Sequence, residues 1–186
     1  MANVYDVADF FIELANQSEE DTITNLKLNK LLYFAQGHHL AKTGTPLFSD
    51  PIEARKFGPV VQAIYQKYKI CGKNHILSDG KDVSEAFTDK EYDILLDVAR
   101  EYCKYTAAHL VNLTHAPETP WSNTKKENQI DTNSIEAYFL NKEKVLSFEE
   151  ILAKKDIKPI GYRDEDGYLV LPKEEDDEYW DKYDEM

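Results

Sequence analysis

The sequence has few residues of the kinds that mark several common protein classes. Only two cysteines occur among its 186 residues, Cys71 and Cys103, and they are far apart in the chain. Because they form neither a CxxC motif nor a disulfide framework, we expect two buried, reduced thiols. The seven glycines are scattered and form no glycine-rich loop for phosphate. These absences argue against a zinc module, a disulfide scaffold and a P-loop nucleotide-binding protein.

Long apolar runs are also missing. No stretch approaches the roughly 20 apolar residues that a membrane-spanning helix needs. The first helical segment, residues 4–15, is interrupted by Asp6, Asp9 and Glu13, which is unlike a signal peptide. We therefore expect a soluble, cytoplasmic chain with no membrane partner.

Positive charge is scarce. Lys and Arg number 22 against 35 Asp and Glu, a formal net charge of −13. Residues 1–145 hold −5 of this charge and residues 146–186 hold −8. Because phosphate contacts need Lys and Arg, we expect no direct nucleic-acid partner. A basic protein partner fits better, although an acidic tail can also serve solubility alone.

Helical periodicity dominates what is present. Pro is well tolerated at the first helical position, so Gly58-Pro59 is interpreted as a helix start, whereas Pro117 and Pro120 are expected to exclude helix around them. Residues 45–54 are expected to form a loop or a short strand. Helices are predicted over 4–15, from Thr24 or Asn25 to Gly44, from Gly58-Pro59 to Cys71, from the capping box Thr88–Glu91, after Thr106, and from near Ser134.

The C-terminal part has a different character. Asp166-Gly167 lies between apolar alternations, which predicts a β-hairpin over residues 158–172. Residues 173–186 contain eight acids with Tyr179, Trp180 and Tyr183 among them. The predicted fold class is therefore mainly α: a compact multi-helix single domain over residues 1–145, followed at residues 146–186 by a hairpin and an acidic aromatic tail.

No catalytic constellation stands out. His38 and His39 are adjacent, so on a helix they point about 100° apart and cannot share a metal ion as an i, i+4 pair does. The motifs GxSxG and HExxH are absent, and a chain with 35 acids always offers some carboxylate pair. We predict no enzyme, no metal and no cofactor; a metal-dependent hydrolase or nuclease is the least favoured alternative.

Three polar side chains near apolar stripes have more than one interpretation. Lys27 and Lys30 flank the apolar stripe of the second predicted helix; either they form a solvated face, or they contact an acidic group on a partner or on the chain's own tail. His115 lies before Pro117, where a ring nitrogen can tie the turn and position Trp121 over the core. We expect a structural role for this histidine.

A series of short motifs resembles a known family. Residues 25–37, Asn-Leu-Lys-Leu-Asn-Lys-Leu-Leu-Tyr-Phe-Ala-Gln-Gly, are followed by Pro46-Leu47-Phe48, Ile52-Glu53-Ala54 and Phe57–Val61. Leu110, Thr114-His115, Pro120-Trp121, Ile130, Ile135 and Tyr138-Phe139 then follow in the same order as in the family, and Asp6-Val7-Ala8 fits its opening. Over roughly residues 4–140 the chain is similar to the Panacea domain, the SocA-like and GepA-like antitoxins of phages and mobile elements.

The resemblance implies a function. Such an antitoxin neutralises a toxin from the adjacent gene by direct protein contact, without a cofactor, and the toxins act in diverse ways. One member instead delivers its toxin to the ClpXP protease, so a proteolytic adaptor or another phage–host interaction protein is the alternative. Arg55-Lys56 stands where the family has a large aromatic residue, which leaves the shape of the groove beside Gly58 open.

Residue roles follow from the matched positions. We expect the tail aromatics to help wrap a toxin; a solubility tail is the alternative. The expected structural residues are Leu28, Leu31, Leu32, His115 and Trp121. The candidate partner-binding residues are Lys27, Lys30, Tyr33, Gly58, Pro59, Val60, Tyr65, Tyr168, Tyr179 and Trp180.

Overall fold

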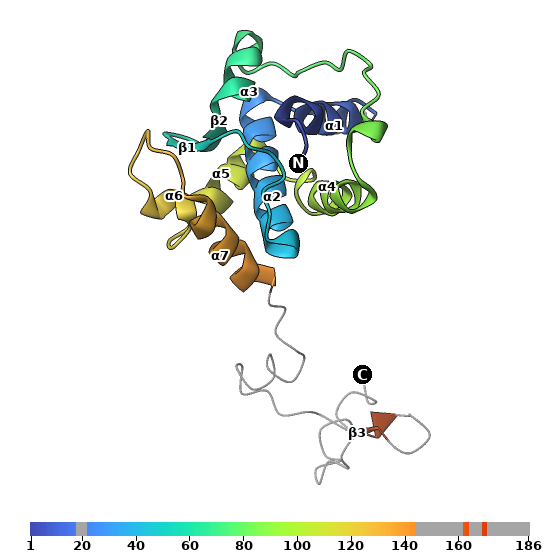
Figure 1. The fold of residues 1–186 in the computed structure, drawn as a ribbon, viewed down its shortest axis with the longest axis vertical. Helices are drawn as coiled ribbons and strands as arrows, with labels where there is room; N and C mark the ends of the chain where they lie inside the picture. The colour runs from blue at the N-terminus through green and yellow to red at the C-terminus, as the bar shows by residue number, and fades with distance from the viewer. Residues whose placement is uncertain (18–21, 144–161, 164–168, 171–186) are drawn as a thin grey trace, which may run out of the picture. The chain divides into compact units, whose positions relative to one another are not determined.

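A computed structural model describes residues 1–17, 22–143, 162–163 and 169–170. Contacts divide the chain into two units, Met1–Lys144 and Val145–Met186. The first unit is mainly helical (Figure 1). Its elements are α1 (Val4–Asn16), α2 (Asn25–Thr43), β1 (Ile52–Arg55), β2 (Gly58–Val61), α3 (Gln62–Lys67), the 3-10 turns η1 (Lys69–Cys71) and η2 (Ser84–Ala86), α4 (Asp89–Tyr102), α5 (Ala107–His115), α6 (Pro120–Asn123) and α7 (Thr132–Glu143).

Helix α2 is the central element of this unit. It packs against α1, α3, α4, α5, α7 and β2, which surround it in Figure 1. Leu28, Leu31 and Leu32 are fully buried, as their helical spacing predicts. Because neighbours cover α2 on most sides, its polar positions are buried as well, and the helix has no wide solvent-facing stripe.

The polar residues of α2 are buried with hydrogen-bond partners from other parts of the chain. The Lys27 ammonium donates to the Cys103 carbonyl at 2.6 Å. The Gln36 amide donates to the Phe48 carbonyl at 3.1 Å and accepts from the Leu47 N–H at 2.9 Å. Each bond satisfies a group that would otherwise be costly to bury, so α2 holds the surrounding loops through its polar side chains.

Several predicted helix ends are confirmed. Thr88 and Glu91 form the capping box: the Thr88 hydroxyl accepts from the Glu91 N–H at 3.3 Å, and the Glu91 carboxylate accepts from the Thr88 N–H at 2.9 Å. Thr24 caps α2 and Thr106 caps α5 through their side-chain oxygens. Helix α2 is followed by Gly44 in the left-handed conformation, with φ of 67°.

Two predictions made from proline are wrong. Gly58–Val61 is strand β2 rather than the start of a helix, and α3 begins only at Gln62. Gly58 has φ of 100°, which no α-helix contains, and Pro59 continues an extended strand. Pro120, expected to exclude helix, instead opens the short helix α6 after the Thr119 cap. The preference for Pro at the first helical position therefore applies at Pro120 and not at Pro59.

The second unit contributes two short strands. β3 (Tyr162–Arg163) pairs antiparallel with β4 (Leu169–Val170), with Tyr162 opposite Val170. This pairing confirms the predicted C-terminal hairpin. The predicted Asp166-Gly167 turn and the acidic residues 173–186 lie outside the described residues.

The cysteines depart from expectation in one respect. Cys71 and Cys103 are both half-buried rather than buried. Among the described residues, no helix combines the length and the apolar composition needed to cross a membrane.

Candidate functional site

The strongest candidate site is built around the hairpin β1–β2. Its register places Ile52 opposite Val61 and Glu53 opposite Val60. One face of the hairpin carries Ile52, Ala54 and Val61, which are buried in the core. The opposite face carries Val60, which is buried, and Glu53 and Arg55, which are half-buried and are the part that a partner can reach.

Both edges of the hairpin are covered. On the β1 side, residues 127–130 run alongside: the Ala54 N–H donates to the Asn128 carbonyl at 2.9 Å, and the Ile130 N–H donates to the Ile52 carbonyl at 2.8 Å. On the β2 side, the Val61 N–H donates to the Asn29 side-chain oxygen of α2 at 2.9 Å. With its edges paired, the hairpin is a fixed platform rather than a free strand edge.

Lys30 of α2 holds the hairpin through a hydrogen bond to β2. Its side chain is 0% exposed, and its ammonium donates to the Pro59 carbonyl at 2.6 Å. Burial lowers the pKa of Lys30 to about 7, because the charged form has lost its water. A Cβ on Gly58 would lie 2.7 Å from the Lys30 Cε and 2.8 Å from the Thr114 hydroxyl oxygen, so only glycine fits at this position.

His115 and Trp121 fix strand β1 at the same, turn end of the hairpin, where Arg55 pairs with Gly58. Their rings stack with centroids 3.7 Å apart and an interplanar angle of 4°, and the Trp121 N–H donates to the Arg55 carbonyl at 2.9 Å. The His115 Nε2 is buried and has no hydrogen-bond partner. Burial lowers the pKa of His115, and the positive charges of Lys30 and Lys126 lower it further. We expected a hydrogen bond from a histidine ring nitrogen to hold this turn. The structure instead shows the His115 ring stacked on Trp121, and the Trp121 N–H donating to Arg55.

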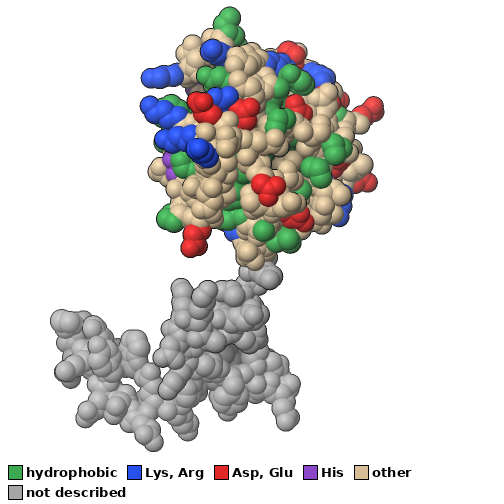
Figure 2. Space-filling view, turned by 60° about the vertical axis from the view of Figure 1, so that its left-hand side comes forward, with side chains coloured by type: hydrophobic (Ala, Val, Ile, Leu, Met, Phe, Trp, Pro, Cys, Tyr) green, Lys and Arg blue, Asp and Glu red, His purple; other side chains and the backbone are tan. Residues whose placement is uncertain are grey.

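A groove opens beside this platform, with a volume of about 640 Å³. Its floor includes Leu26, Asn29 and Val60. Basic side chains predominate among the charged residues of its wall. The charged residues that line the groove are Arg55, Lys56, Lys69, Lys73 and Glu127. Figure 2 shows Lys and Arg side chains gathered along one edge of the domain, on a molecule whose net charge is strongly negative.

Apolar side chains are exposed in and next to the groove. Phe57, at the tip of the hairpin, is 58% exposed, and Tyr65 on α3 is 39% exposed. Ile70, between Lys69 and Cys71 in η1, is 95% exposed. Large apolar side chains left in water next to a concave surface are typical of binding sites.

The structure separates the candidate partner-binding residues into three groups. Tyr65 lines the groove and is exposed; Val60 also lines the groove but is buried. Lys27, Lys30, Tyr33, Gly58 and Pro59 are buried, so they do not present a contact surface; this corrects the expectation for them. Tyr168, Tyr179 and Trp180 lie outside the described side chains.

Tyr33 shows how closely these motif positions are packed. Its ring contacts Phe34 and Phe139 edge-on, with centroids 5.5 Å and 5.6 Å apart. Its hydroxyl is buried without a hydrogen-bond partner, and burial raises the pKa of the phenol. The Cβ of a larger residue at Gly37 would overlap the Phe139 ring, so α2 and α7 approach closely here.

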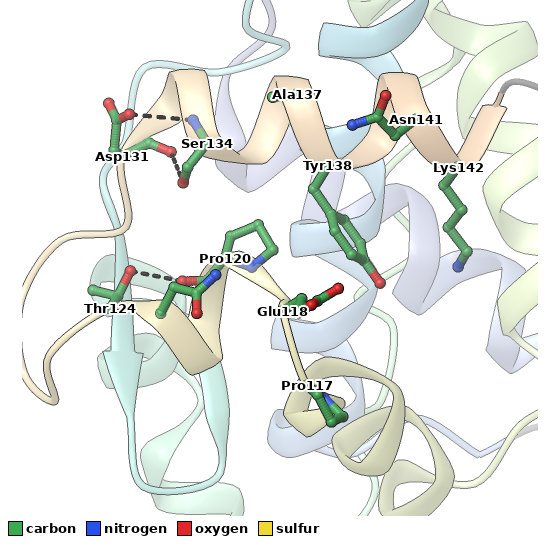
Figure 3. Close-up of a pocket in the computed structure, with 11 residues that line it drawn as sticks. Pro117, Glu118, Pro120, Thr124, Asp131, Ser134, Ala137, Tyr138, Asn141 and Lys142 are labelled. Atoms are coloured by element: carbon green, nitrogen blue, oxygen red, sulfur yellow. Dashed lines mark hydrogen bonds between the residues drawn. The ribbon is translucent and has the colours of Figure 1, made fainter.

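A second concavity, of about 750 Å³, lies between α6 and α7 (Figure 3). Tyr138 projects from α7 toward Glu118, whereas the Lys142 ammonium donates to the Tyr102 hydroxyl at 3.3 Å. Several of its polar groups are engaged at the ends of helices: the Ser134 hydroxyl donates to the Asp131 carbonyl at 2.7 Å. Its lining has charges of both signs and no strongly exposed aromatic ring, so the groove beside the hairpin is the better candidate.

The histidines that could have suggested a metal have structural contacts. His38 Nε2 lies 3.1 Å from the Tyr102 hydroxyl, and His39 Nδ1 lies 2.7 Å from the Thr45 carbonyl. Within residues 1–17 and 22–143, no group of three or more His, Cys, Asp and Glu side chains is placed to hold a metal ion.

Sequence reasoning did not identify the charged wall of the groove. Arg55-Lys56 stands out in the sequence only as a departure from the family pattern. Lys69 and Ile70 fall in the last turn of the helix predicted to end at Cys71, and Lys73 follows it. The one available signal is local composition: residues 55–73 contain five basic residues and no acid. That run could have been read as a basic patch in an otherwise acidic chain.

The fold and groove define a mainly helical binding domain built on one central helix. Residues 28–122, half of the chain, match the family described as antitoxin SocA-like, Panacea domain. The chain is 34% identical over 109 residues to antitoxin SocA of Caulobacter vibrioides (strain NA1000 / CB15N), which covers 53% of this chain and 58% of that protein. No solved structure matches.

This chain belongs to the Panacea-domain family of SocA-like antitoxins. The matched region includes most of α2, the hairpin, most of the groove lining and the Trp121 anchor, and it ends shortly after the start of α6. Asn25, Leu26 and Glu127, which also line the groove, lie outside it. The alignment spans a little more than half the length of the curated relative.

Proposed function

We propose that this chain is the antitoxin of a toxin–antitoxin pair and neutralises the protein toxin of the adjacent gene by direct, non-catalytic binding. The observation that carries the proposal is the groove beside a hairpin that is fixed on both edges and exposes Phe57 and Tyr65. Family membership supplies the kind of partner.

The shape of the groove supports a protein partner. A stable protein complex buries about 1,200–2,000 Å² in total, and most of its binding energy comes from a few aromatic and basic side chains. The groove offers both kinds on a backbone that need not rearrange, because Lys30, Asn29 and Trp121 hold the hairpin. A preorganised surface of this kind loses little conformational entropy on binding.

The test is a growth assay followed by purification. The adjacent reading frame is expressed from an inducible promoter with and without this chain, and the chain is then recovered by an affinity tag. We expect growth arrest without the chain, rescue with it, and recovery of the toxin in a stable complex. A neighbour that is harmless alone, or toxic but not rescued, would contradict the proposal.

One outcome would favour the adaptor alternative. An adaptor lowers the abundance of its partner in a ClpXP-dependent manner, whereas an inhibitor leaves the partner intact and bound. The assay is therefore repeated in a strain without ClpX, with the toxin quantified by immunoblotting. Rescue that persists in this strain supports stoichiometric neutralisation; rescue that requires ClpX supports delivery to the protease.

A further inference from the structure

The groove has the opposite charge to the chain as a whole. Arg55, Lys56, Lys69 and Lys73 line it, and Glu127 is the one acid among the described residues of its lining. The formal net charge of the chain is −13. A local reversal of this size at a concave surface attracts negative groups, because the fields of neighbouring cations add where the walls exclude water.

The basic residues differ in how far their charge is already neutralised. Arg55 forms an ion pair with Glu53 at 2.6 Å and lies 3.8 Å from Glu127. Lys69 and Lys73, at the far side of the groove, are exposed, and no acidic side chain shares the groove wall with them there. These two lysines therefore provide most of the attraction for an incoming anion.

The apolar groups lie between the charges. Lys56 extends over the Phe57 ring, with its ammonium 5.3 Å from the ring centroid, and Tyr65 lines the groove between the hairpin and η1. Next to it, Ile70 is almost fully exposed. A ligand that fills this surface therefore needs a large apolar side chain flanked by negative charge.

We infer that the groove binds an acidic segment of the partner protein that carries an aromatic or branched apolar anchor. The inference rests on the proposed function and specifies the chemistry of the toxin surface. The apolar anchor fits the pocket bounded by Phe57, Tyr65 and Val60, and acidic residues on either side of it pair with Lys69 and Lys73. Charge pairs at the rim speed association and select the partner, while the buried anchor supplies affinity.

A nucleic acid is a poorer fit for the same groove. Binding to a polyanion requires many phosphate contacts along a continuous basic track, whereas here Glu53 and Glu127 flank Arg55 and the rest of the chain is acidic. A short acidic peptide needs only the few cations that the groove provides. Single-stranded DNA therefore serves as a competitor in the test.

The test uses the full chain and two charge-reversal variants with equal net charge. In the first, Lys69→Glu and Lys73→Glu alter the groove; in the control, Lys90→Glu and Lys104→Glu alter two exposed lysines outside it. The probe is a fluorescein-labelled peptide rich in Glu with one central Trp, and a second peptide has Gln in place of each Glu. Binding is measured by fluorescence anisotropy, and thermal unfolding checks that both variants fold.

We expect the Glu peptide to bind the wild-type chain at least about tenfold more tightly than the Gln peptide. The groove variant and Phe57→Ser should each lose about tenfold, while the control variant stays within about twofold of wild type. Equal losses in the groove and control variants, no preference for the Glu peptide, or displacement by single-stranded DNA at the peptide's own affinity would each overturn the inference.

The same variants separate this inference from the proposed function. In the growth and purification assay, the groove variant should fail to recover the toxin while the control variant recovers it. If both variants rescue growth and retain the toxin, the antitoxin function stands and the groove is not its binding site. If the wild-type chain recovers no toxin, the proposed function fails, and the peptide measurement still decides the specificity of the groove.

Discussion

The fold strongly alters the chemistry of Lys30. A lysine normally keeps its ammonium in water, yet this side chain is fully buried and donates a hydrogen bond to the Pro59 carbonyl. Burial lowers the pKa of Lys30 from 10.5 to about 7. The hydrogen bond connects α2 to β2 at Pro59. Because proline has no N–H, its carbonyl is the backbone group available there for such a bond.

The buried lysine makes stability depend on pH. Between pH 7 and pH 10 the unfolded chain keeps a proton on Lys30 that the native chain has lost, so raising the pH stabilises the native state. From pH 7 to pH 9 this amounts to about 2 kcal/mol, and Lys30→Met should abolish it. Urea unfolding of both proteins at the two pH values measures the difference.

The same pH dependence in the wild type and in Lys30→Met would contradict the assignment of this effect to Lys30. If the free energy of unfolding rises equally with pH in the wild type and in Lys30→Met, the pH dependence comes from other groups. Lys27→Met is a useful control, because the Lys27 ammonium also donates to a backbone carbonyl, that of Cys103, at 2.6 Å.

At the scale of elements, the hairpin β1–β2 depends on its first β2 residue. Gly58 combines φ of 100° with contacts that leave no room for a side chain. Gly44, which follows α2, also has a positive φ, of 67°, but a Cβ there would meet nothing within 4 Å. The two glycines therefore differ in crowding more than in backbone strain.

Gly58→Ala should destabilise the protein more than Gly44→Ala. Both substitutions incur the cost of a left-handed backbone, and only Gly58→Ala must also displace Lys30 and Thr114, which adds roughly 1–3 kcal/mol. Denaturant unfolding of the two single variants measures the difference directly. Equal losses would mean that the Lys30 side chain moves aside freely.

Local signals predicted the helices better than the hairpin. The capping residues Thr88 and Thr106 and the terminating Gly44 were read correctly, because a cap depends on residues only a few positions apart. Gly58-Pro59 was misread as a helix start, since nothing local reveals that Ile52–Arg55 pairs with it. That pairing in turn depends on Asn29, Lys30 and residues 127–130, which are distant in sequence.

At the scale of the whole molecule, charge is unevenly distributed in sequence and in space. Residues 146–186 carry −8, and the groove of the first unit is basic. The net charge pointed to a basic partner, while the groove selects an acidic segment. Both can hold for one partner whose surface has patches of each sign, since complementarity acts patch by patch.

Deleting residues 158–186 tests whether the acidic aromatic segment contributes to binding. We expect the truncated chain to bind the toxin more weakly, most clearly at low salt, because the deletion removes acids that steer a basic surface together with Tyr168, Tyr179 and Trp180. Affinity is measured by calorimetry at two ionic strengths. Unchanged affinity and unchanged rescue of growth would leave the segment a role in solubility alone.

The sequence by itself determined the family, the helical class, most helix ends and the C-terminal hairpin. These features depend on residues close together in the chain, through periodicity, caps and ordered motifs. The burial of Lys27 and Lys30 is visible only in the tertiary structure. The same holds for the groove that Arg55, Lys56, Lys69 and Lys73 line together. Burial and proximity depend on how distant segments pack, and α2 is the helix around which that packing occurs.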